Sequence, residues 1–141
     1  MSSINRPKVG VAVLIWRDGK VLLCKRHQSH GDGTWQTPGG HLEFSESWEE
    51  AAAREAKEEV GVELANIRFL AATNDVFESE GKHYLTIWMQ ADWAANEPAS
   101  QEPEKISHVE WHTLHNLPSP LFEPCYTNLK KIKPELFVHE P

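Results

Sequence analysis

Eight glutamates are crowded into the stretch "TPGGHLEFSESWEEAAAREAKEEVGVEL" at residues 37–64. Glu55, Glu58 and Glu59 lie three and four positions apart, which brings side chains together on one face of a helix. Two carboxylates 4 Å apart repel by about 4 kcal/mol at an effective dielectric of 20. Such a group therefore favours a hard divalent cation with oxygen ligands, such as Mg²⁺. The alternative is an acidic amphipathic helix whose carboxylates are solvated.

Local signals define the helix that carries these glutamates. Ser47 and Glu50 form the pattern of a capping box, and Gly61 is placed to end the helix in a left-handed conformation. The sequence thus predicts a helix over 48–60.

The same helix predicts which carboxylates point inward. At 100° per residue, Trp48, Ala51 and Ala52 share the sector of the three glutamates. A helix with simply solvated carboxylates would place them opposite Trp48, so the pattern favours a site over a solvated face.

A glycine pair precedes the helix. Without side chains, Gly39 and Gly40 allow the backbone to come close to a ligand. We expect them to form a loop against the carboxylates. Together the loop, the capped helix and the acidic cluster predict a site where metal ions bridge the carboxylates and the phosphates of a ligand.

The whole chain limits the possible classes of protein. Its 141 residues suit a single domain over 1–141 with a core at about 8–132. The formal net charge of −7 argues against bulk binding to nucleic acid or to an anionic membrane. Two cysteines, no apolar N-terminal run and no apolar segment of membrane-spanning length lead us to expect a cytoplasmic protein.

Alternating and apolar segments predict a mixed sheet with two helices, which makes the fold class α+β. Asp18 and Gly19 predict a tight turn between the first two strands. The expected strands are 9–16, 21–26, 35–37, 67–76, 84–91 and 109–113, and the expected second helix is 123–132.

The acidic stretch resembles the signature of the Nudix hydrolase family, written G-x5-E-x7-R-E-U-x-E-E-x-G-U with U a bulky aliphatic residue. Its positions are filled by Gly40, Glu46, Arg54, Glu55, Ala56, Glu58, Glu59, Gly61 and Val62. Ala56 is smaller than the usual aliphatic residue. Further segments are similar to MutT-like members: "GTWQTPGGHLEF", "HYLTI", "EPEK" and "PLF". The resemblance implies an α/β/α sandwich around a mixed sheet.

The resemblance also implies roles for residues of the signature. Glu55 and Glu59 match the main metal ligands, and Glu58 matches a third ligand or the general base. The carbonyl of Gly39 matches a further ligand. Arg54 matches one partner of an ion pair that orients the helix, and the other partner is Glu46.

Outside the signature, several residues are candidates for substrate or metal binding. Lys25 and Arg26 either neutralise phosphate or are solvated, and Trp35 is either pocket wall or core. Glu104, or else Glu102, either joins the metal site from a mobile loop or belongs to an ordinary acidic loop. The remaining substrate-binding candidates are Gly40 beside the phosphates, Thr86 on a strand facing the base, and Phe122 against the base.

The resemblance implies a Mg²⁺-dependent hydrolase, with Mn²⁺ as a substitute, that converts nucleoside triphosphates to the monophosphate and pyrophosphate. The expected partner is a small nucleotide, and a homodimer is common among such proteins. One alternative is a Nudix hydrolase for another nucleoside diphosphate derivative, such as a nucleotide sugar. Another is a Nudix module that binds nucleotides without turnover, although such modules usually lack signature glutamates that this sequence retains.

Overall fold

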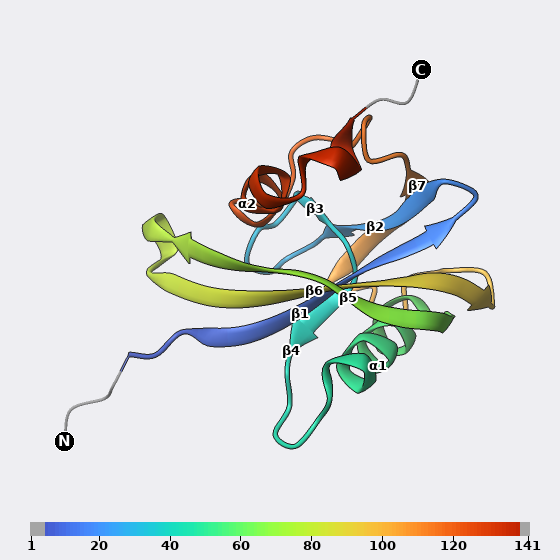
Figure 1. Ribbon diagram of the computed structural model, residues 1–141, viewed down its shortest axis with the longest axis horizontal. Coiled ribbons are helices and arrows are strands. Elements are labelled where there is room, and N and C mark those ends of the chain that lie inside the picture. Colours follow the sequence, from blue (N-terminus) through green and yellow to red (C-terminus); the bar gives the residue numbers. More distant parts are fainter. Residues whose placement is uncertain (1–4, 139–141) are drawn as a thin grey trace.

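A computed structural model describes residues 5–138 of the chain. A twisted seven-stranded sheet lies between two helices, α1 (Trp48–Val60) on one side and α2 (Cys125–Ile132) on the other (Figure 1). This arrangement confirms the predicted α+β sandwich. The expected single domain also includes residues 1–4 and 139–141, which lie outside the described residues.

The sheet is mixed, as predicted. Its main path runs β3-β2-β1-β6-β5, with β4 added beside β1 and β7 beside β2. Among the named strands of residues 5–138, only β1 and β6 pair in parallel, from Lys8 with Tyr84 to Trp16 with Asp92. The strands are β1 (Lys8–Arg17), β2 (Lys20–Arg26), β3 (Trp35–Gln36), β4 (Gly39–His41), β5 (Glu63–Phe77), β6 (Lys82–Ala95) and β7 (Ile106–His112).

Two differences from the predicted elements affect the site. Gly39 and Gly40 belong to strand β4 and not to a loop, because Val11 and Ala12 of β1 pair with them. The long strands β5 and β6 extend beyond their predicted ends, since each continues to pair with the other past its apolar segment. The turn at Asp18 and Gly19 is confirmed, with positive φ at both residues.

Helix α1 has the predicted bounds. The side chain of Ser47 accepts from the backbone of Glu50, whose side chain accepts in return from Ser47, and Gly61 adopts a left-handed conformation at the C-terminal end. Ala51 and Ala52 are buried against the sheet, as expected. The inward placement of Trp48 was wrong, because the first residue of the helix lies against the edge strand β5 and contacts Phe69 there, leaving Trp48 41% exposed.

Each helix covers a separate apolar core. The core under α1 includes Val13, Leu22 and Met89, and the core under α2 includes Leu14, Leu23 and Trp88. Consecutive residues of β1 and β2 thus enter opposite cores, as the two-residue period of a strand requires. The short helix η2 (Pro134–Phe137) follows α2, and η1 (Glu78–Glu80) joins β5 to β6. Within residues 5–138, no helix is long and apolar enough to cross a membrane.

Candidate functional site

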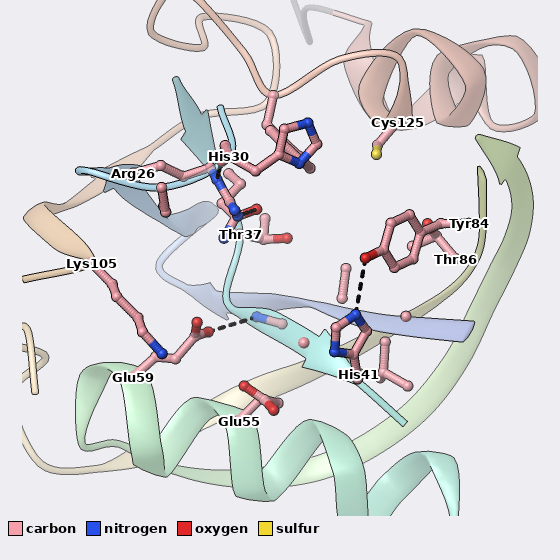
Figure 2. Close-up of a pocket in the computed structure, with 18 of the residues that line it drawn as sticks. Arg26, His30, Thr37, His41, Glu55, Glu59, Tyr84, Thr86, Lys105 and Cys125 are labelled. Carbon is pink, nitrogen blue, oxygen red and sulfur yellow. Dashed lines mark hydrogen bonds between the residues drawn. The ribbon is translucent and has the colours of Figure 1, made fainter. Parts of the chain in front are cut away.

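Most of the predicted site residues line a cavity of about 520 Å³, a volume within the usual range for small-molecule sites. Figure 2 shows Glu55 and Glu59 of α1 on one side of this cavity, and Tyr84, Thr86 and Cys125 on the opposite side. Of the predicted residues, those lining it are Arg26, Gly39, Gly40, Glu55, Glu58, Glu59, Thr86 and Phe122. The cavity therefore has an acidic end and an aromatic end.

The glycine pair makes room for protein atoms as well as lining the cavity. A Cβ at Gly40 would lie 2.5 Å from Oε1 of Glu55, and one at Gly39 would lie 2.4 Å from the carbonyl oxygen of Val11. The N–H of Gly39 donates a hydrogen bond of 2.8 Å to Oε1 of Glu59 (Figure 2). Glycine at position 40 therefore allows β4 to lie close to Glu55 of α1, and glycine at position 39 allows it to lie close to β1.

Burial dominates the electrostatics of the acidic end. It raises the pKa of Glu59 to about 8, since the hydrogen bond from Gly39 offsets only part of the desolvation and the nearby Glu55 and Glu102 add repulsion. Burial also raises the pKa of Glu55, although Arg54 acts in the opposite direction. Glu58 is exposed, so the inward placement predicted for the three glutamates holds only for Glu55 and Glu59. The structure thus holds partly uncompensated carboxylates at the cavity wall.

Arg54 connects the helix to the segment before it, as the resemblance implied. Its Nε donates to Glu46 at 2.6 Å and its Nη2 donates to the other oxygen of Glu46 at 2.9 Å. Its Nη1 donates to Glu55 at 2.7 Å, and its Nη2 also donates to the carbonyl of His41. The hydrogen bond from Arg54 lowers the pKa of Glu46. Arg54 therefore positions Glu55 and ties α1 to the end of β4.

The donor set of the acidic end fits a hard divalent cation. Carboxylate oxygens of Glu55, Glu58 and Glu59 and a backbone carbonyl are the ligand types that Mg²⁺ prefers. Within residues 5–138, no three acidic, histidine or cysteine side chains already surround a single point. The fit therefore rests on the type and burial of the donors.

Glu102, and not Glu104, lines the cavity. The loop that carries Glu102 is anchored to the end of α1, because Gln101 N donates to the carbonyl of Glu59 and Ala99 N donates to that of Val60. The expectation of a mobile loop finds no support in these bonds. The same anchoring places Glu102 near Glu59, with which it interacts electrostatically.

The two adjacent basic residues at the end of β2 point to opposite faces of the sheet. Arg26 lines the cavity, where it donates to Oε1 of Gln36 at 2.7 Å and lies over the ring of Phe122 at 4.3 Å. Lys25 is not among the lining residues and lies near the ring of Trp35 instead. Side chains of consecutive strand residues point to opposite faces, which explains why only one of the two reaches the cavity.

Aromatic side chains form the other end. Phe122 contacts Phe77 and His30, with ring centroids 5.2 Å apart in both pairs. Tyr84 stacks on His41 and hydrogen-bonds to it at 3.0 Å (Figure 2). The buried Trp35 belongs to the core under α2 and does not line the cavity, which resolves its two readings in favour of core.

Several lining residues were missed by sequence reasoning: His30, His41, Phe77, Tyr84, Lys82, Lys105 and Cys125. Tyr84 is two positions before Thr86 on the same strand, so the strand period could have indicated it. Cys125 was treated only as a free cysteine, and burial, followed by the influence of Asp75, raises the pKa of its thiol. His30 and Lys105 come from loops, and His41 comes from a strand that pairs with the distant β1. Phe77 and Lys82 pair with each other at the ends of β5 and β6.

Comparisons with known proteins agree with this geometry. The family model described as NUDIX domain matches residues 6–135. Among solved structures, a MutT NUDIX hydrolase from Burkholderia pseudomallei is 31% identical with a TM-score of 0.83, covering 91% of this chain and 99% of that one. A MutT protein from Methanosarcina mazei Go1 has a TM-score of 0.73 at 24% identity over 94% and 98% of the two chains, which supports the fold alone.

Two curated relatives found by sequence similarity are named NudC and not MutT. A NAD-capped RNA hydrolase NudC from Pseudomonas aeruginosa is 36% identical over 106 residues, which are 75% of this chain and 36% of the relative. One from Pasteurella multocida is 33% identical over 126 residues, which are 89% of this chain and 44% of the relative. The chain thus spans less than half of the length of these relatives.

Proposed function

This chain belongs to the Nudix family, and from that premise we propose that it is a metal-dependent hydrolase of the pyrophosphate linkage in nucleotides. Nucleoside triphosphates are the substrate class that we propose, with a nucleoside monophosphate and pyrophosphate as products. The family match over 6–135 and the similarity to a MutT NUDIX hydrolase along almost its whole chain support this proposal.

One observation carries the proposal beyond family membership. The carboxylates of Glu55 and Glu59 are gathered at one end of a cavity whose other end is aromatic. A nucleotide has the same two parts, a polyphosphate that needs a cation beside carboxylates and a base that packs against rings. The cavity therefore suits a ligand with phosphates towards α1 and a base towards Phe122.

The acidic residues would hold the cation and take part in proton transfer. Glu55, Glu58 and Glu59, with the carbonyl of Gly39, are the proposed ligands of Mg²⁺, which when bound would supply charge neutralisation and acidify water. Arg54 keeps Glu55 in place through the 2.7 Å hydrogen bond. A carboxylate of this set accepts the proton of the attacking water.

The basic residues of the cavity act on the phosphates. Arg26 lies over Phe122 and also interacts electrostatically with Glu59, which places it between the two ends, and Lys82 and Lys105 also line the cavity. These cations attract the polyphosphate into a chain whose net charge would otherwise repel it. We propose that they orient the leaving phosphate while the aromatic rings hold the base.

A panel of substrates tests the proposal. Purified protein is incubated with nucleoside triphosphates, ADP-ribose and NAD in Mg²⁺, in Mn²⁺, in Ca²⁺ and in excess chelator. Phosphate is measured with and without added inorganic pyrophosphatase, and the nucleoside monophosphate formed from each substrate is measured by chromatography. We expect phosphate from triphosphates only when pyrophosphatase is present, with turnover in Mg²⁺ or Mn²⁺ and none in Ca²⁺ or chelator. Turnover confined to ADP-ribose or NAD would contradict the triphosphate as substrate.

A matched pair of variants assigns the turnover to the acidic end. Glu55→Gln removes a carboxylate at the cavity, and Glu49→Gln makes the same change on an exposed residue of the same helix. We expect loss of activity only in Glu55→Gln. Nucleotide binding without any turnover in the unsubstituted protein would favour the non-catalytic module instead.

A further inference from the structure

A buried aspartate lies beneath the part of the cavity wall formed by Gly10, Thr86 and Trp88, which we call the floor. Asp75 of β5 is fully buried. Its Oδ2 accepts from the hydroxyl of Thr86 at 2.6 Å and from that of Thr73 at 2.9 Å, and its Oδ1 accepts from Nδ2 of Asn128 at 2.8 Å. Within residues 5–138, no lysine, arginine or histidine forms an ion pair with it. The carboxylate is satisfied by neutral donors.

Donor-only groups fix the direction of the hydrogen bonds around Asp75. Nε1 of Trp88 donates to the hydroxyl oxygen of Thr73 at 2.9 Å, and an indole N–H cannot accept. The hydrogen of Thr73 is therefore directed to Asp75. Since a carboxylate only accepts, the hydrogen of Thr86 is directed to it as well. This leaves the Thr86 oxygen with acceptor capacity alone on the side of the cavity.

The floor leaves this oxygen accessible to a ligand. Gly10 pairs with Thr86 in the sheet and has no side chain to cover it. Even an added Cβ at Gly10 would meet only ordinary contacts, at 3.7 Å from Gly40 O and 3.8 Å from Tyr84. Among the hydrogen bonds of residues 5–138, the only one at the Thr86 hydroxyl is the bond to Asp75. A donor on the ligand would give the hydroxyl oxygen of Thr86 a second hydrogen bond.

We propose that Thr86, held in one orientation by Asp75, determines which nucleoside the cavity accepts by taking a hydrogen bond from an amino group of the base or from a sugar hydroxyl. The proposal rests on the function proposed above. A nucleoside without that donor would cover the oxygen of Thr86 without pairing with it, and a site built to pair with such a group discriminates strongly against the analogue that lacks it. Asp75 acts through Thr86 and is a positioning residue.

Substrate pairs that differ by one donor test the role of Thr86. The pairs are GTP and ITP, ATP and purine riboside triphosphate, and a ribonucleotide with its 2′-deoxy form. We expect the unsubstituted protein to favour the donor-bearing member of one pair by at least about tenfold in kcat/KM. Thr86→Val, which has no acceptor, should bring that ratio close to one, and Thr86→Ser should preserve it. The pair that responds shows whether the donor belongs to the base or to the sugar.

A second variant tests the role of Asp75. Nδ2 of Asn128 also donates to the carbonyl of Asn74 at 3.1 Å, which keeps this amino group directed at residue 75. In Asp75→Asn the introduced amide must therefore turn its oxygen to Asn128 and its amino group to Thr86. The hydroxyl of Thr86 would then donate into the cavity, and the ratio should fall below that of Thr86→Val.

Thr73→Val is the matched control, because Thr73 shares the same carboxylate oxygen but does not line the cavity. It should reduce thermal stability and leave the ratio unchanged. The same pairs are also compared as monophosphates, whose dissociation constants are measured by calorimetry, because this measurement needs no turnover. Failure of the proposed function shows as absence of triphosphate hydrolysis by the unsubstituted protein. The role of Thr86 is overturned if no pair is discriminated or if Thr86→Val changes no ratio, and that of Asp75 if Asp75→Asn behaves like Thr73→Val.

Discussion

Replacing Gly40 of β4 by alanine should remove most of the activity at a modest cost in stability. In Gly40→Ala the new Cβ would lie 2.5 Å from Oε1 and 2.7 Å from Oε2 of Glu55. The clash is with the end of a flexible side chain, so the fold can persist if the Glu55 carboxylate moves. Ordinary van der Waals contact begins at 3.4 Å, so the required shift is about 0.9 Å.

That shift of the Glu55 carboxylate should lower both the stability and the activity of the protein. Moving the carboxylate weakens its hydrogen bond to Arg54, and a hydrogen bond to a charged group contributes about 1.5–3 kcal/mol. Alanine for glycine recovers about 0.4–1 kcal/mol through the unfolded chain. We therefore expect a loss of roughly 1–2 kcal/mol in the free energy of unfolding. Misplacement of a catalytic group by about 1 Å can reduce kcat/KM by about 100-fold.

Gly39→Ala is the matched comparison at the neighbouring position. Its Cβ would lie 2.4 Å from the carbonyl oxygen of Val11 and 3.0 Å from the Cα of Ala12. Backbone of the paired strand cannot move aside as a side chain can, and overpacking of this kind costs about 1–3 kcal/mol or more. We expect Gly39→Ala to be the less stable of the two variants.

Thermal unfolding and steady-state kinetics on both variants provide the assay. For a domain of this size each kcal/mol corresponds to roughly 3–5 °C in Tm. Gly40→Ala should unfold a few degrees below the unsubstituted protein and lose almost all activity. The reasoning would be refuted if Gly40→Ala retained more than about a third of kcat/KM, or if it lost as much stability as Gly39→Ala.

Three further outcomes are expected. Glu59→Gln should lower kcat/KM by more than about tenfold, equivalent to about 1.4 kcal/mol, with the fold retained in circular dichroism; equal activity in Glu59→Gln and Glu49→Gln would contradict this. Tyr126→Phe removes the hydroxyl that accepts from Thr37 N at 2.6 Å, and an unpaired buried N–H should cost about 1–3 kcal/mol in denaturant unfolding; an unchanged midpoint would count against the bond. Burial and neighbouring cations lower the pKa of His30 below its usual 6.5. As the pH decreases below 6.5, His30 is therefore protonated more readily in the unfolded chain than in the folded protein, and the stability of the folded protein falls. His30→Phe should therefore lose less Tm than the unsubstituted protein between about pH 7.5 and pH 5.5, and an identical loss would exclude this contribution.

Local signals were sufficient to predict the helix that carries the glutamates. Its cap at Ser47, its end at Gly61 and the shared face of Glu55 and Glu59 depend on neighbours within a few positions along the chain. The ion pair of Arg54 with Glu46 was predictable only through the resemblance to a known family. Spacing alone does not show that the segment before the helix folds back onto it.

Features that depend on pairing between distant strands were not predictable. The glycine pair became strand β4 because β1 lies beside it, and Gly40 makes room for Glu55. Asp75 gave no signal in the sequence, since its partners at Thr86 and Asn128 lie 11 and 53 positions away. The choice of Glu102 over Glu104 follows from anchoring of its loop to α1, which no local pattern indicates.

The products formed from a nucleoside triphosphate test the proposed chemistry most directly. The protein is incubated with Mg²⁺ in water enriched in ¹⁸O, and the products are resolved by ³¹P NMR. We expect equal amounts of nucleoside monophosphate and pyrophosphate, with the label in the pyrophosphate, and no turnover in excess chelator. A nucleoside diphosphate with inorganic phosphate as the first products, or turnover that persists in chelator, would contradict a metal-dependent pyrophosphohydrolase built on Glu55 and Glu59.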